Sequence, residues 1–145
     1  MNNLIDNILV QIKNFADNEI KNYSMLSLAF LGDAIYSLYV REKLIVEGNF
    51  KVKDLHSKAT KFVKAKAQCY SLNQIEPILT EEENQIVKTA KNAKTNNIAK
   101  NASIKEYKSA TAFESLLGYL ALKKNYERLN KILNCSFNAI INNFD

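Results

Sequence analysis

Two nearly uncharged stretches of this chain hold one acidic residue and one glycine apiece: Asp33 follows Gly32 in the first, and Glu114 precedes Gly118 in the second. A carboxylate is costly to bury in apolar surroundings unless another group pairs with it. A glycine inside a helix costs about 1 kcal/mol relative to alanine, so it needs a packing or functional reason. Two helices that meet at these glycines would bring Asp33 and Glu114 together. The pattern therefore indicates a candidate cation site.

The elements expected to position these acids are helices. Apolar residues recur at helical spacing, no stretch shows the two-residue period of a strand, and the chain has one proline and three glycines. The predicted helices cover about 3–16, 26–46, 54–72, 81–90, 107–123 and 126–142. Asp54 or Ser57 is expected to cap the third helix, and Thr80 with Glu83 forms a capping box before the fourth. We therefore expect an all-α fold.

The length of 145 residues fits one domain, residues 1–145, with enough chain for a real hydrophobic core. No apolar stretch reaches membrane-spanning length without a charge, and the start of the chain lacks the layout of a signal peptide. Cys69 and Cys135 have no partner at metal-ligand spacing, which favours reduced thiols. We expect a cytoplasmic protein with no membrane association.

The net charge of +5 is concentrated in two segments. Residues 48–70 contain six lysines and one aspartate, and residues 88–108 contain six lysines and one glutamate. Concentrated positive charge is typical of a surface that binds a polyanion. For either segment alone, a solvated lysine face is the better interpretation. Two such segments flanking an acidic pair favour a nucleic acid.

Residues 91–105 are expected to form a long basic loop, with four lysines, four asparagines and no aromatic residue. Lysines can contact phosphates, and asparagines can reach sugar hydroxyls or base edges. The absence of aromatic side chains argues against stacking on single-stranded bases. For any single lysine of the loop, RNA contact and simple solvation are equally supported.

Several motifs, in unbroken order, resemble the catalytic domain of ribonuclease III, and most closely its short form, Mini-ribonuclease III, which lacks a double-stranded-RNA-binding domain. The motifs are Leu28-Ala29-Phe30-Leu31-Gly32-Asp33-Ala34, Tyr39-Val40-Arg41, Lys91-Asn92-Ala93-Lys94, Lys100-Asn101 and Ala110-Thr111-Ala112-Phe113-Glu114. One such motif would be weak, but the ordered set, spread over residues 25–122, is specific. The resemblance implies a single-domain, helical endonuclease fold.

The resemblance also implies a metal site. Ribonuclease III domains carry four acidic ligands, two on each signature helix, and the matching positions here are Ala29 and Asp33, then Thr111 and Glu114. Spacings of four and three place each pair on one helix face. The short form shares this reduced set. Asp33 and Glu114 are thus implied as catalytic residues and Mg²⁺ ligands, with Thr111 contacting a metal-bound water, and Mg²⁺ commonly takes only one or two carboxylates.

A further implication concerns the RNA. The family's contacts to the duplex come from the region between the fourth and fifth predicted helices. In this chain the matching residues are Lys91, Asn92, Lys94, Lys100, Asn101 and Lys105.

The implied activity is Mg²⁺-dependent cleavage of double-stranded RNA that leaves 5′-phosphate and 3′-hydroxyl ends, with processing of the 23S ribosomal RNA precursor as its cellular role. A homodimer suits a duplex because two symmetry-related sites can each cut one strand. The missing acids at Ala29 and Thr111 support an alternative, a non-catalytic double-stranded-RNA-binding module with a decayed site. A helical protein-interaction domain is a third hypothesis. The sequence assigns no role to His56 or Arg41, and packing is the default for Tyr36.

Overall fold

The computed structural model describes residues 14–93 and 103–143, and each regular element within these ranges is a helix. The elements are α2 (Asp17–Lys21), α3 (Met25–Glu47), α4 (Val52–Val63), α5 (Ala65–Ile75), the 3₁₀ helix η1 (Glu76–Ile78), α6 (Glu81–Lys91), α7 (Ile104–Leu122) and α8 (Tyr126–Asn143). The predicted all-α class is confirmed. Within the described ranges, no helix has both the length and the apolar character needed to cross a membrane.

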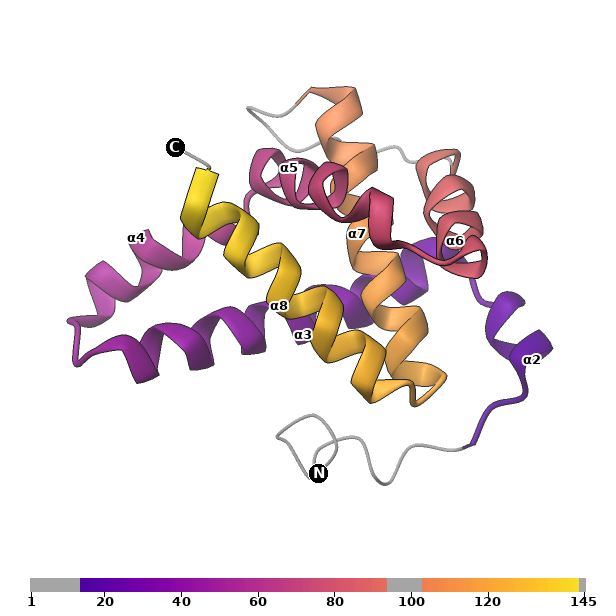
Figure 1. Ribbon diagram of the computed structural model, residues 1–145, viewed down its shortest axis with the longest axis horizontal. Helices are drawn as coiled ribbons and strands as arrows, with labels where there is room; N and C mark the ends of the chain where they lie inside the picture. The colour runs from indigo at the N-terminus through magenta and orange to yellow at the C-terminus, as the bar shows by residue number, and fades with distance from the viewer. Residues whose placement is uncertain (1–13, 94–102, 144–145) are drawn as a thin grey trace.

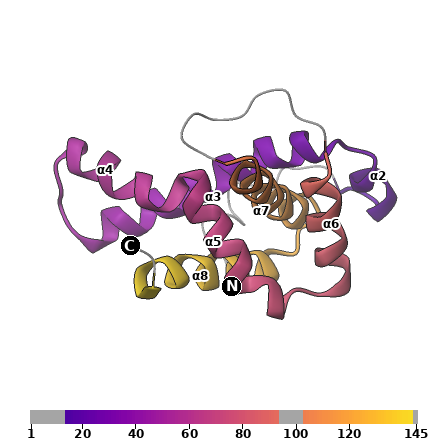
Figure 2. The ribbon, with the colours of Figure 1, turned by 90° about the horizontal axis from the view of Figure 1, so that it is seen from above.

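Helix α7 is the centre of the fold. Figure 2 shows it nearly end-on, with α3, α5, α6 and α8 around it, and Figure 1 shows α3 crossing it at a steep angle. Each residue from Ser109 to Ala121 is buried except Glu114, which is partly exposed. A helix that is apolar on all sides belongs in a core. The single acid of this buried run therefore lies where the central helix reaches the edge of the core.

Helices α3 and α7 touch at the two glycines identified in the sequence. A Cβ atom added to Gly32 would lie 1.7 Å from the carbonyl oxygen of Glu114. One added to Gly118 would lie 2.0 Å from the carbonyl oxygen of Leu28. Neither distance leaves room for a side chain, so only glycine allows the two backbones to approach this closely. The contacts are reciprocal, since each glycine lies one helical turn from the residue that the other one touches.

Capping side chains fix where the two helices on either side of the undescribed segment 94–102 begin. The predicted capping box at Thr80 is confirmed: the Glu83 amide donates to Thr80 Oγ1 over 3.1 Å, and the Thr80 amide donates to Glu83 Oε1 over 2.9 Å. A second capping box, between Ser103 and Glu106, starts α7 three residues before the predicted position 107. Helix α7 therefore includes Ile104 and Lys105, which were expected to lie in the basic loop.

The helix predicted over 54–72 is in fact two helices, α4 and α5. The chain turns at Lys64, whose backbone is extended with ψ of 151°, and this residue caps the end of α4 and the start of α5. The Gln68 side-chain amide donates to the carbonyl oxygen of Val63 over 3.0 Å, which satisfies one of the terminal carbonyls of α4. Neither proline nor glycine marks the break, so the usual signals of a helix end were absent.

Two further boundaries differ from prediction. Residues 3–13 of the first predicted helix lie outside the described residues, residues 14–16 are not helical, and the short helix α2 follows them. Helix α4 begins at Val52 with Lys51 as its N-cap, so Asp54 lies in the first turn instead of capping the helix. A carboxylate there still interacts favourably with the helix dipole.

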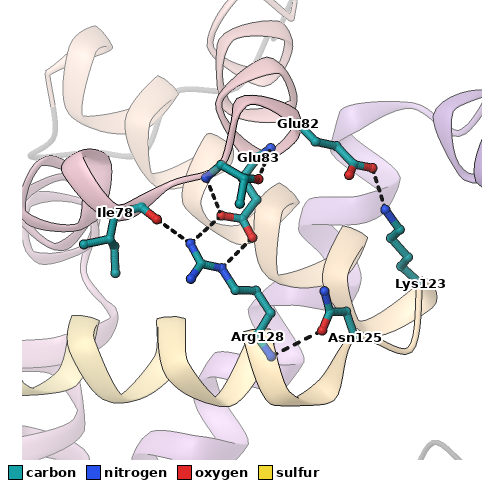
Figure 3. Close-up of polar contacts among 7 residues, drawn as sticks. Ile78, Glu82, Glu83, Lys123, Asn125 and Arg128 are labelled. Carbon is teal, nitrogen blue, oxygen red and sulfur yellow. Dashed lines mark hydrogen bonds and ion pairs between the residues drawn. The ribbon is translucent and has the colours of Figure 1, made fainter.

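An ion pair between the buried Glu83 and the partly exposed Arg128 joins α6 to α8 (Figure 3). Arg128 donates from Nε to Glu83 Oε2 over 2.7 Å and from Nη2 to Glu83 Oε1 over 2.8 Å. The same Nη2 also donates to the carbonyl oxygen of Ile78. The capping carboxylate of α6 is thus paired as well as hydrogen-bonded, which is the condition for burying a charge.

We predict that Gly118→Ala destabilises the protein by about 1–3 kcal/mol or more, because its methyl group would overlap the backbone of α3 and force the central helices apart. The matched control is Gly48→Ala, where the added carbon would meet only the ring of Phe50, a side chain that can move. Urea unfolding of both variants gives the free energies. Equal stability of the two variants would contradict the role of the glycine contact.

Candidate active site

The glycine contacts place Asp33 and Glu114 together. Asp33 directly follows Gly32, which lies against the backbone of Glu114. The two carboxyl groups lie close enough for Asp33 to raise the pKa of Glu114, with Asp33 exposed and Glu114 mostly buried. The expectation that these helices meet at their glycines and juxtapose the two acids agrees with the structure.

The environment of Glu114 favours its protonated form. Burial raises the pKa of Glu114 from its ordinary value of 4.5 to about 9, and the hydrogen bond and negative charge of Asp33 add to the increase. A hydrogen bond from Gln68 acts in the opposite direction and lowers the pKa of Glu114. Two carboxyl groups in contact cannot both ionise without a large electrostatic cost. In the protein alone, the pair therefore retains one proton near neutral pH.

This donor set fits a small divalent cation. Carboxylate oxygens are the ligands that Mg²⁺ prefers, and one or two of them suffice when waters and phosphates complete the coordination. A bound cation would counteract both the burial and the nearby Asp33 charge, which together raise the pKa of Glu114. Within residues 14–93 and 103–143, no group of three or more His, Cys, Asp and Glu side chains is arranged to hold a metal ion.

The two positions that match missing family acids are packed into the protein. Ala29 lies one turn before Asp33 and is 7% exposed, and Thr111 lies one turn before Glu114 and is 8% exposed. The backbone carbonyl of Thr111 accepts a hydrogen bond from Ser115 Oγ over 2.8 Å. The water-mediated role of Thr111 stays a prediction.

One residue of the site was missed in the sequence. Gln68, in the first turn of α5, is 2% exposed, and its Nε2 donates to Glu114 Oε2 over 3.4 Å. Gln68 stands between the apolar residues Ala67 and Cys69, both buried. The only sequence signal for this site was a glutamine between two apolar residues. Because one continuous helix was predicted here, the sequence did not indicate that Gln68 follows a helix break.

The predicted RNA-contacting residues flank the undescribed segment. Lys91 lies in the last turn of α6 and pairs with Glu76 over 3.1 Å, and Asn92 is exposed at the end of that helix. Lys105 is exposed in the first turn of α7, which corrects its placement in a loop. The others lie outside the described residues: Lys94, Lys100 and Asn101. Exposed ion pairs such as Lys91–Glu76 contribute little, so this lysine can change partners at small cost.

The remaining polar residues considered in the sequence lie elsewhere. Tyr36 is fully buried and packs edge-on against Phe113, with ring centroids 5.1 Å apart, as expected for a core residue. Arg41 and His56 line a separate cavity of about 250 Å³ between α3 and α4, together with apolar side chains. Neither of these two residues contributes to the acidic pair.

Known proteins are similar to this chain in sequence and in fold. The sequence pattern of the Ribonuclease III domain matches residues 26–125, which include both acids. A Mini-ribonuclease 3 from Thermoanaerobacter sp. (strain X514) is 47% identical over 117 residues, covering 81% of this chain and 82% of that protein. Another from Brevibacillus brevis is 49% identical over 112 residues, covering 77% and 84%.

A solved structure agrees with these matches. The crystal structure of a Fusobacterium nucleatum protein superposes with a TM-score of 0.74 at 38% sequence identity, and the match covers 83% of this chain and 96% of that one. The domain pattern and the relatives together cover most of the described residues. This chain therefore belongs to the ribonuclease III family, within its Mini-ribonuclease 3 group.

Proposed function

We propose that the protein is a homodimeric, Mg²⁺-dependent enzyme that cuts double-stranded RNA at a site formed by Asp33 and Glu114. Membership of the ribonuclease III family makes the chain an endoribonuclease. The metal, the dimer, the residue roles and the cellular substrate are the parts proposed.

The observation that carries the proposal is the contact between the two carboxyl groups at the α3–α7 crossing. A structural acid is normally paired with a base or a helix end, as Glu83 is paired with Arg128. Glu114 instead faces a second acid, and the pKa of Glu114 is raised to about 9. A strongly perturbed acid beside a like-charged group is a mark of functional sites. The protein keeps an unfavourable pair that a cation would stabilise.

In this proposal the two acids hold the metal ion and the two glycines keep the acids close together. Asp33 and Glu114 would hold Mg²⁺, which when bound polarises the scissile phosphate, assists ionisation of a water and stabilises the leaving 3′ oxygen. Glu114 must first release its proton, because only the carboxylate is a ligand. Gly32 and Gly118 keep the backbones close enough for both carboxyls to reach one point.

The cationic and amide side chains on either side of residues 94–102, a segment that the structure does not describe, support a duplex as substrate. Asn92 and Lys105, both exposed, stand at its two sides with Lys91. Contacts to phosphates and 2′-hydroxyls by such groups recognise the shape of an RNA duplex more than its sequence. By resemblance, we infer that Lys94, Lys100 and Asn101 complete this surface, and that cleavage leaves 5′-phosphate and 3′-hydroxyl ends. The same resemblance supports a cytoplasmic role in maturing the 23S ribosomal RNA precursor.

An exposed apolar stripe along α3 supports the dimer. It consists of Leu26, Phe30, Leu38 and Ile45, which recur at helical spacing. Phe30 is 84% exposed, three residues before Asp33. Large apolar side chains exposed along one helix are a feature of interaction surfaces. We infer that a second copy of the chain covers it, since a duplex has two antiparallel strands and a two-fold dimer supplies one site for each.

We predict that Asp33→Asn lowers Mg²⁺-dependent cleavage of duplex RNA by about 100-fold or more, because a lost metal ligand removes several kcal/mol of charge stabilisation. Gel assays with purified full-length protein give the rates, and thermal unfolding checks that the variant folds. The matched control is Asp54→Asn, an exposed acid in the first turn of α4, which should retain activity. Undiminished cleavage by Asp33→Asn would overturn the mechanism, and duplex binding without cleavage by the wild type would favour the non-catalytic alternative.

We also predict that Phe30→Glu converts the protein from dimer to monomer, because a charge would replace the most exposed apolar side chain of the stripe. Sedimentation velocity at several concentrations measures the change. Ile141→Glu, at a 58% exposed position on α8, should leave the dimer intact. A wild-type protein that sediments as a monomer, or a Phe30→Glu variant that remains dimeric, would reject this interface.

A further inference from the structure

Gln68 is a buried polar residue whose position is not explained by packing. It is 2% exposed, and it lies in the first turn of α5 directly after the break at Lys64. Burial of an amide requires compensating hydrogen bonds, and an unpaired polar atom in a core weakens stability. An apolar residue of similar length would fill the same space without that cost.

The hydrogen bonds of Gln68 fix how its amide is oriented. Its Nε2 donates to the carbonyl oxygen of Val63 over 3.0 Å and to Glu114 Oε2 over 3.4 Å. The reversed amide would turn its oxygen toward the Val63 carbonyl, which can only accept, so the nitrogen must face it. The Oε1 atom of Gln68 has no hydrogen-bond partner among the described residues. The side chain therefore satisfies Glu114 and Val63 while leaving its own oxygen unpaired.

The contact with Glu114 is suited to the ionised carboxylate. A neutral carboxyl is a weak acceptor, and the 3.4 Å separation is long for a hydrogen bond. A carboxylate makes shorter hydrogen bonds that are about twice as strong. Gln68 therefore interacts more favourably with the charged form of Glu114, the form that can bind a cation.

The anchoring of Gln68 gives this contact a fixed direction. One N–H is held by the last residue of α4 and the other reaches α7, so the amide bridges the end of one helix and the acid of another. Asp33 approaches Glu114 from α3. Glu114 is thus held between a neutral donor and a second acid, on residues of three different helices.

We propose that Gln68 is a positioning residue for the metal site: its amide holds the Glu114 carboxylate in the orientation in which Glu114 and Asp33 can share a divalent cation. This inference rests on the proposed function. Gln68 itself need not touch the substrate. With only two carboxylates available, the orientation of each one matters more than in a site with four, and groups that orient metal ligands typically change metal affinity by about 10–100-fold.

The test measures Mn²⁺ binding to the full-length protein without RNA, from the electron paramagnetic resonance signal of free Mn²⁺. Gln68→Met keeps the length and removes the amide, and we expect its Mn²⁺ dissociation constant to rise about ten-fold or more. Gln68→Asn keeps an amide but is one methylene shorter, so it should weaken binding as well. In cleavage assays both variants should need more Mg²⁺ for half-maximal rate, and excess Mg²⁺ should restore the rate.

The matched control is Ser71→Ala. Ser71 lies one turn further along α5, is fully buried, and donates to the carbonyl oxygen of Ser136 over 3.3 Å without contacting the acids. It should lose thermal stability and retain wild-type Mn²⁺ affinity. Gln68→Met also loses the hydrogen bond to Val63, so its thermal stability should fall as well, but it should in addition weaken Mn²⁺ binding, which Ser71→Ala should not.

Unchanged Mn²⁺ affinity in Gln68→Met, or equal weakening in Ser71→Ala, would overturn the role of Gln68. The proposed function would then still stand if Asp33→Asn abolished both Mn²⁺ binding and cleavage. Two other results would refute the proposed function itself: a wild-type protein that binds no Mn²⁺, or an Asp33→Asn variant that cleaves normally. Either result would also refute the role of Gln68.

Discussion

The direct contact between the backbones of α3 and α7 is the constraint on which the site depends. Gly32 lies against the carbonyl of Glu114 and Gly118 lies against the carbonyl of Leu28, so the helices approach at two points one turn apart. This closeness lets two short acidic side chains from different helices meet. It also surrounds Glu114 with protein, which raises the pKa of its carboxyl group. The close packing of the two helices therefore also causes the raised pKa of Glu114.

The rest of the fold supports that crossing. Helix α7 is enclosed by four other helices, so the acid it carries is held on a rigid element (Figure 2). Its first turn is fixed by the Ser103–Glu106 capping box, and that of α6 by Thr80 and the Glu83–Arg128 ion pair. Lys105 thus lies in a capped first turn of α7, while Lys91 lies in the last turn of α6. A basic surface can in this way be presented at a fixed place relative to the acids.

The meeting of α3 and α7 at Asp33 and Glu114 could be predicted from the sequence, because its signals lie within two short stretches. Each of two apolar stretches holds one acid and one glycine, and a buried acid and a helical glycine both need a specific reason. The break at Lys64 was not predictable, since it lacks proline or glycine and depends on Gln68 reaching the carbonyl of Val63. The start of α7 was predicted three residues too late, because the Ser103 cap lies in a polar stretch whose composition is typical of a loop. Gln68 escaped notice because its partner lies 46 residues away.

The central claim is that the crossing builds a cation site between Asp33 and Glu114. Crystals of the protein soaked in Mn²⁺ and measured at the manganese absorption edge test it directly. The account predicts an anomalous peak in contact with carboxylate oxygens of both residues, with Glu114 deprotonated. A peak bound elsewhere, or none beside this pair at saturating Mn²⁺, would contradict it.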